Sequence, residues 1–105
     1  MAVKTAKTVP YIAKFLLENS RIKEYEFFLK PGEKTEMHSH PDYIIYMLCD
    51  SRLKIAMADG RTEEADFKAG QSSYKQAQTH SIENIGNTDA RALVVELKEL
   101  HILEF

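Results

Sequence analysis

The chain has 105 residues, of which 44% are hydrophobic and 29% charged, as in an ordinary globular protein with one hydrophobic core. Its formal net charge of -2 offers no basic surface for binding nucleic acid. No apolar run reaches the roughly 18 residues that a membrane span needs, and the first residues lack the apolar segment of a signal peptide. We therefore expect a single domain over residues 1–105 that works in the cytoplasm, with neither nucleic acid nor membrane as a partner.

Most of the chain reads as short strands separated by turn residues. Residues 1–19 are ambiguous, because Pro10 interrupts them and 11–17 could form a short helix or an extended segment. Further on, Pro31-Gly32 and Asp59-Gly60 are turn signals between runs of alternating or β-branched residues. The expected strands are 21–29, a histidine-containing segment at 32–41, then 43–49, 53–57, 62–67, 71–76, 79–84 and 90–97. Strands at intervals of about ten residues predict an all-β sandwich or barrel.

The run from Tyr43 to Cys49 is apolar throughout. Its β-branched and aromatic residues predict a strand that is buried on both faces. Cys49 is the only cysteine, so the chain can form no internal disulfide, and we expect it to be a small core residue. By contrast, the charged stretch 96–99 is typical of a solvated strand face.

Two histidines, His38 and His40, stand two residues apart in a segment with strand character. Successive side chains of a strand point to opposite faces, so both imidazoles project to the same side. Such a pair is equally typical of a solvated strand, and a metal site needs a third ligand. His80 lies in a later strand, and distant strands of an antiparallel barrel line one interior. Three histidines together would suit zinc, iron, nickel, copper or manganese.

These residues resemble the two motifs of the cupins, which are small jelly-roll β-barrels. Gly32, His38 and His40 fit the first motif, Gly-x5-His-x-His, without a gap. Gly70, His80 and Asn84 fit the second motif, with the stretch from Gly to His one residue short. The likeness covers about residues 20–98 and implies a single-domain cupin-type jelly-roll β-barrel with a metal at His38, His40 and His80.

Within the superfamily, the chain is most similar to small single-domain cupins associated with β-alanine degradation. The features that carry this closer resemblance are Asn19 to Lys23, Pro41-Asp42-Tyr43 and Lys68-Ala69-Gly70. It implies a small polar metabolite as the ligand or substrate.

The chain also departs from the cupin pattern. The metal-binding Glu of the first motif should fall at residue 44 or 45, and both are isoleucine. Three neutral imidazoles without a carboxylate leave a divalent ion its full charge for a substrate or water. Cupins of the thiol dioxygenase kind share this ligand set. The resemblance leaves two hypotheses open, a metal-dependent enzyme of dioxygenase or isomerase type using iron, zinc, nickel or manganese, and a non-catalytic ligand-binding or regulatory cupin, with or without metal.

The sequence also predicts the surroundings of the site. The resemblance assigns the barrel interior to the face of Ile44 and Tyr46. Gln78 and Asn84 are candidates for orienting the imidazoles, although Asn84 could instead serve the turn at Gly86. The expected pocket residues are Phe27, Leu29, Tyr46, Tyr74, Gln76, Gln78, Ile82 and Asn84.

The fourth histidine, His101, has no motif support and is expected at the surface or an interface. It lies in one of two apolar terminal segments, Tyr11–Leu17 and Leu100–Phe105. Exposed apolar segments of this kind often cover a partner subunit, so we expect a homodimer that forms by pairing of sheet edges.

Overall fold

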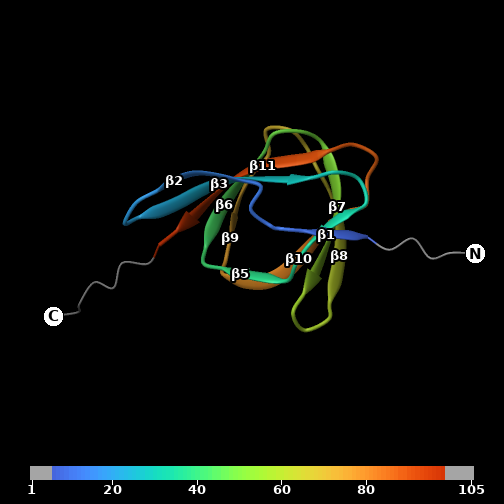
Figure 1. Ribbon diagram of the computed structural model, residues 1–105, viewed down its shortest axis with the longest axis horizontal. Helices are drawn as coiled ribbons and strands as arrows, with labels where there is room; N and C mark the ends of the chain where they lie inside the picture. Colours follow the sequence, from blue (N-terminus) through green and yellow to red (C-terminus); the bar gives the residue numbers. More distant parts are fainter. Residues whose placement is uncertain (1–5, 99–105) are drawn as a thin grey trace, which may run out of the picture.

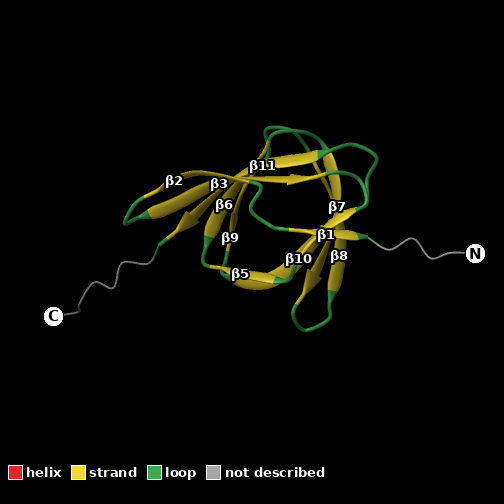
Figure 2. Ribbon diagram, viewed as in Figure 1, coloured by secondary structure: helices red, strands yellow, loops and turns green. Residues whose placement is uncertain are grey.

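The structure is a computed structural model that describes residues 6–98, and in this range it contains eleven strands and no helix (Figures 1 and 2). One sheet contains β1 (Lys7–Val9), β4 (Glu33–Thr35), β5 (His38–His40), β7 (Ser51–Met57), β8 (Thr62–Phe67) and β10 (Gln78–Asn84). The other contains β2 (Lys14–Glu18), β3 (Ile22–Leu29), β6 (Tyr43–Met47), β9 (Ser72–Lys75) and β11 (Ala90–Leu97). Within residues 6–98 there is also no helix with the length and hydropathy of a membrane span.

The two sheets face each other as in a jelly roll. The first has the strand order β1-β4-β10-β7-β8, with β5 also paired to β10, and the second has the order β2-β3-β11-β6-β9. All the described pairings are antiparallel except the one between β1 and β4. The all-β jelly-roll prediction is confirmed. The sheets do not close into a true barrel, because within residues 6–98 the edge strand β8 pairs only with β7, and the edge strand β9 only with β6.

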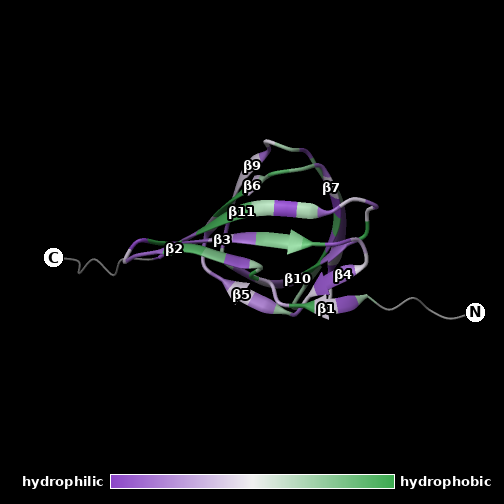
Figure 3. Ribbon diagram, turned by 45° about the horizontal axis from the view of Figure 1, so that its top comes forward, coloured by the Kyte–Doolittle hydropathy of each residue, from purple (hydrophilic) through white to green (hydrophobic). Residues whose placement is uncertain are grey.

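The core lies between the sheets and is built by the period of two in each strand. Along β3, for example, Tyr25, Phe27 and Leu29 are at most 1% exposed, while the residues between them are only partly buried. Figure 3 shows the C-terminal half of β3 as hydrophobic and β5 as hydrophilic. The other buried apolar residues are Tyr11, Tyr43, Met47, Leu53, Ile82, Ala90, Ala92 and Val94.

The ambiguous segment 11–17 contains no helix: bends at Tyr11 and Ala13 lead into strand β2, which agrees with the second of its two expected forms. One expectation for the elements needs revision. The strand expected at 43–49 ends at Met47 and is not buried on both faces: Tyr43 and Met47 face the core, whereas Ile44 and Tyr46 are 37% and 44% exposed. The apolar run misleads because an antiparallel sheet leaves its outer face to solvent. The C-terminal segment Leu100–Phe105, with His101, lies outside the described residues.

Asn84 ends β10 and ties three backbone groups together. Its Nδ2 donates to the carbonyls of Leu29, at 3.0 Å, and Thr88, at 2.8 Å, while its Oδ1 accepts the N–H of Gly86 at 3.0 Å. The side chain is 1% exposed. The Asn84 amide therefore stabilises the turn at Gly86 and does not orient an imidazole, which was the other role expected for it.

We predict that Asn84→Ala lowers the free energy of unfolding by about 2–4 kcal/mol, because it removes the donor to the buried carbonyl of Leu29 and to the partly buried carbonyl of Thr88. Thermal and urea unfolding of both proteins measure the effect. Asn87→Ala, at an exposed position of the same turn, serves as the control and should change stability by less than about 0.5 kcal/mol. Equal stability of the Asn84 variant and the parent would contradict this role.

Candidate functional site

The pairing of β5 with β10 brings the three histidines together. His38 and His80 are direct partners in the register, and Gln78 is the partner of His40. Opposed residues of an antiparallel pair put their side chains on the same face. His40 shares that face with His38 because the two are separated by one residue. The three ring nitrogens that could bind a metal lie within 4.8 Å of one another.

The imidazole rings of the cluster are in contact. The Nε2 atoms of His40 and His80 are 2.9 Å apart, and the ring of His38 lies edge-on to that of His80 with a centroid separation of 4.7 Å. Two unprotonated nitrogens at 2.9 Å repel each other. The metal-free cluster therefore needs a proton between His40 and His80, whereas a bound cation would draw both lone pairs to itself.

Backbone carbonyls fix the tautomers of two of the histidines. Nδ1 of His38 lies 2.9 Å from the carbonyl oxygen of Glu36, and Nδ1 of His40 lies 3.3 Å from that of Pro41. A carbonyl can only accept, so both Nδ1 atoms carry the proton and both Nε2 atoms keep a lone pair. Nε2 of His38 and Nδ1 of His80 are buried and hydrogen-bond to none of the described residues.

Burial keeps the cluster neutral. His80 and His40 are only 2% and 6% exposed, and His38 is partly buried. Loss of water contact lowers the pKa of His38 and of His40. The same burial, with repulsion from the other two imidazoles, lowers the pKa of His80 to about 3. At neutral pH the three rings are therefore uncharged, which is the form that binds metals.

Tyrosine rings pack against the two β5 histidines. The ring of Tyr11 stacks on His38 with centroids 3.7 Å apart and an interplanar angle of 14°. The ring of His40 meets Tyr43 at 89° with centroids 4.1 Å apart. Gln78 donates from Nε2 to the Tyr43 hydroxyl at 3.0 Å. Gln78 therefore bonds to a tyrosine and not to an imidazole. The imidazole N–H groups, which Gln78 and Asn84 were expected to bind, instead donate to the carbonyls of Glu36 and Pro41.

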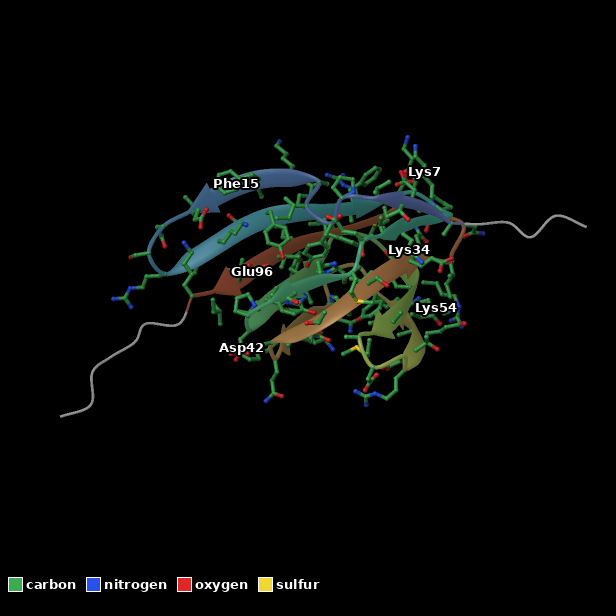
Figure 4. All side chains as sticks on the ribbon, turned by 60° about the horizontal axis from the view of Figure 1, so that its bottom comes forward. Lys7, Phe15, Lys34, Asp42, Lys54 and Glu96 are labelled. Carbon is green, nitrogen blue, oxygen red and sulfur yellow. The ribbon has the colours of Figure 1, made fainter. Side chains whose placement is uncertain are left out.

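Behind Tyr11 lies a chain of hydroxyl groups that ends at a carboxylate. The Tyr25 hydroxyl donates to Oε2 of Glu96 at 2.6 Å, and the Tyr11 hydroxyl lies 3.0 Å from that of Tyr25. Tyr25 has one proton and the carboxylate only accepts, so Tyr11 donates to Tyr25. Burial raises the pKa of both tyrosines. Figure 4 labels Glu96 near the end of β11.

Sequence reasoning missed Glu96 by treating 96–99 as a solvated face. A signal was present, because Ala90, Ala92 and Val94 are all buried and the period of two puts Glu96 on the same face. Glu96 was assigned to the solvated face because it is charged, although its place in the strand predicts that it points inward.

A small pocket of about 130 Å³ reaches His80 between the two sheets. Apolar side chains form most of it, and its polar members besides His80 are Glu63, Lys75 and Gln78. The full lining is Tyr43, Ile45, Met47, Leu53, Ile55, Met57, Glu63, Ala65, Phe67, Lys75, Gln78, His80 and Ile82.

Of the eight expected pocket residues, Gln78 and Ile82 line this pocket. Tyr46 and Tyr74 are wrong as pocket residues: they are 44% and 58% exposed, on the outer face of their sheet, where Tyr74 donates to Asp42. Gln76 is also exposed, and Phe27 is a core residue packed against Tyr11. The resemblance assigned the wrong face of β6 to the interior.

That correction identifies which isoleucine faces the site. Ile45 lines the pocket with His80, whereas Ile44 points outward. An apolar side chain therefore stands inside, at one of the two positions where the cupin motif places its Glu. Among the described residues, the cluster with a geometry that could hold a metal ion consists of the three histidines without a carboxylate.

No protein-family model matches the chain, and no curated protein matches it by sequence. Among solved structures it is similar to a cupin domain from Bordetella pertussis Tohama I, with 22% identity, a TM-score of 0.78 and coverage of 93% of this chain and 100% of the other. It is similar to a predicted oxalate decarboxylase from Thermotoga maritima, with 27% identity, a TM-score of 0.60 and coverage of 81% and 77%.

A third similar structure is an RmlC-like cupin family protein from Methanocaldococcus jannaschii, with 17% identity, a TM-score of 0.65 and coverage of 80% and 76%. These three descriptions do not mention β-alanine, so the closer resemblance stays a prediction. The two facing sheets and the three-histidine cluster agree with the cupin superfamily, and the fold of this chain is the cupin fold.

Proposed function

We propose that the chain is a metal-binding cupin in which His38, His40 and His80 hold one divalent ion. The observation that carries the proposal is the convergence of three neutral imidazoles, with Nε2 of His38 buried and unpartnered among the described residues. Leaving a buried nitrogen without a partner costs about 1–3 kcal/mol, and a bound cation removes that cost. Iron, zinc, nickel and manganese all accept such ligands.

The residues around the cluster orient and shield it. The carbonyls of Glu36 and Pro41 fix two rings with Nε2 toward the site. Tyr11 and Tyr43 cover the β5 histidines and exclude water from them. When bound, the ion supplies Lewis acidity or a redox centre, undiminished by any ligand charge.

The ligand that we propose is a small polar metabolite with a carboxylate group. The pocket of about 130 Å³ fits only a small molecule, and its apolar wall suits a short carbon chain. An ion held by three neutral ligands attracts an anion. The likeness to a protein described as a predicted oxalate decarboxylase supports this class.

We further propose that the protein works in the cytoplasm as a homodimer and that it is a metal-dependent enzyme of dioxygenase or isomerase type.

A second candidate is a cupin that binds its ligand without transforming it. It is favoured by Ile45, an apolar side chain in the pocket that His80 also lines, at one of the two positions where the cupin motif places its Glu. The two candidates differ in the fate of the ligand. Incubating the metal-loaded protein with small carboxylates, with and without oxygen, and following them by mass spectrometry separates turnover from simple binding.

The metal site itself is tested by elemental analysis of protein purified without a metal-affinity tag. We expect about one divalent ion per chain, and its loss in His38→Ala, His40→Ala and His80→Ala, because each variant removes one of three ligands. The control is Ser39→Ala, since Ser39 lies between the two β5 histidines and bonds to Thr79 instead. Stoichiometric metal in all three histidine variants would overturn the proposal.

Substitutions of Tyr11 test whether ring stacking positions His38. Tyr11→Leu removes the stacked ring and should weaken metal affinity about tenfold, as loss of groups that orient a ligand commonly does. Tyr11→Phe keeps the ring, loses only the hydroxyl and should stay close to the parent. Competition with a chromogenic chelator measures both affinities. If the two variants weaken equally, the hydroxyl chain to Glu96 and not the stacked ring is responsible.

The histidines also predict how the stability of the metal-free protein depends on pH. Their pKa values are lowered in the folded state, whereas in the unfolded chain they return to about 6.5. Below pH 6.5 the unfolded chain binds more protons, so their contribution to stability is complete above that pH and is lost as the pH falls toward the folded pKa. For His80 the free energy of unfolding falls by about 1.4 kcal/mol for each unit of pH below 6.5, down to the folded pKa of about 3.

Urea unfolding in the presence of a chelator, between pH 7 and 5, measures this slope. His80→Asn removes one of the titrating groups and should flatten the curve. A slope that stays unchanged in this variant would show that other groups cause the loss of stability.

A further inference from the structure

Strand β2 differs from the other described strands because every one of its side chains is exposed. All five residues of Lys14–Glu18 are exposed, and three are large and apolar: Phe15, Leu16 and Leu17, at 55%, 39% and 47% exposure. The strand is also an edge, since β3 is its only described neighbour. Among residues 6–98 no strand pairs with the other side of β2, and an unpaired edge of this kind can pair with a further strand.

The position of β2 makes this edge accessible. Figure 1 shows β2 and β3 extending beyond the body of the molecule on the side away from β7 and β8, and Figure 4 shows Phe15 at that end. Natural proteins commonly protect an edge strand with proline, with charges or by covering it. Lys14–Glu18 contains no proline, and its two charges stand at its ends around three apolar residues.

The sequence of β2 is complementary to itself. If two copies of Lys14–Glu18 run antiparallel with Leu16 on the two-fold axis, Leu16 faces its symmetry mate and Phe15 faces Leu17 of the other copy. In the same register Lys14 faces Glu18 across the axis, and the symmetry repeats this pair. Glu18 also pairs with Lys98 of its own chain at 2.6 Å, and a carboxylate has room to accept from both amines.

We propose that the protein forms a two-fold homodimer through antiparallel pairing of β2 with β2 of a second copy, with Leu16 at the centre. The pairing joins two five-stranded sheets into one continuous sheet and covers the three exposed apolar residues of each chain. It rests on the homodimer proposed above but not on the metal. The homodimer proposal above specifies neither the contact surface nor the strand register, and the β2 pairing specifies both.

A second copy fits this edge better than an unrelated partner, because an isologous contact requires the same segment to match itself. A register shift between Phe15 and Leu17 makes Leu16 an extra residue opposite β3. Such a bulge re-aims side chains, here at the middle of the proposed contact. The segment that follows Tyr11 leads into β2, so the dimer contact also anchors the tyrosine that covers His38.

Sedimentation equilibrium and light scattering of the parent and of Leu16→Glu test the surface. The parent should be a dimer at tens of micromolar, and the variant, with two carboxylates facing each other at the axis, a folded monomer. Tyr46→Glu introduces the same charge at an exposed apolar position on β6 of the same sheet and should stay dimeric. Circular dichroism and thermal unfolding check that each variant is folded.

Charge reversal tests the register. Lys14→Glu puts a second carboxylate opposite Glu18, and Glu18→Lys puts a second amine opposite Lys14, so each variant alone should dimerise about tenfold more weakly than the parent. When the two variants are mixed, one of them labelled with 15N, each like-charged pair becomes an opposite one. Native mass spectrometry should then detect mainly the mixed dimer.

Three results would overturn the proposal. A monomeric parent would refute the homodimer itself. A dimer that Tyr46→Glu breaks and Leu16→Glu leaves intact would place the contact on the outer face of the sheet and refute only the β2 surface. A purely statistical mixture of the charge variants would refute the register.

Discussion

The register between β5 and β10 is the constraint on which the rest of the site depends. It puts His38 opposite His80 and, through the strand period, places His40 on the same face. A shift of one residue would turn the His80 side chain to the other face of the sheet and separate the cluster. The register is held on the other side by β7, which pairs with β10 from His80 to Asn84, and at its end by the three hydrogen bonds of Asn84. The turn residue and the candidate metal ligands are thus parts of one strand pairing.

The interior is divided between a polar and an apolar region. On one side the hydroxyls of Tyr11 and Tyr25 lead to Glu96, which lies near the end of β11. On the other side the pocket beside His80 is mainly apolar. The histidines lie where the two regions meet. Neutral imidazoles suit this position, because they bring nitrogen lone pairs into the interior without the cost of burying a charge.

Much of the fold follows from local sequence signals. The strands expected at 21–29, 62–67 and 90–97 differ from β3, β8 and β11 by at most one residue at either end, because their alternation and turn residues agree. The run 43–49 was harder to interpret, because an apolar outer face looks the same in the sequence as a buried one. Tyr46 and Tyr74 were misplaced for that reason.

The parts of the site that could not be predicted depend on distant pairings. The three histidines were recognisable because motif spacing identifies them one by one. Tyr11, Tyr25 and Glu96 come from three separate segments, and their contacts exist only once β3, β11 and the N-terminal segment are packed together. No spacing rule within one segment describes such a chain of hydroxyl groups.

The separation between β8 and β9 has a consequence for the rate at which a ligand exchanges. Both strands line the pocket, through Ala65 and Phe67 of one and Lys75 of the other, and no described backbone hydrogen bond joins them. A molecule that enters there need not break a strand ladder. Entry between these two strands is then limited by side-chain rotations, which take up to nanoseconds in exposed residues, and not by breaking hydrogen bonds between strands.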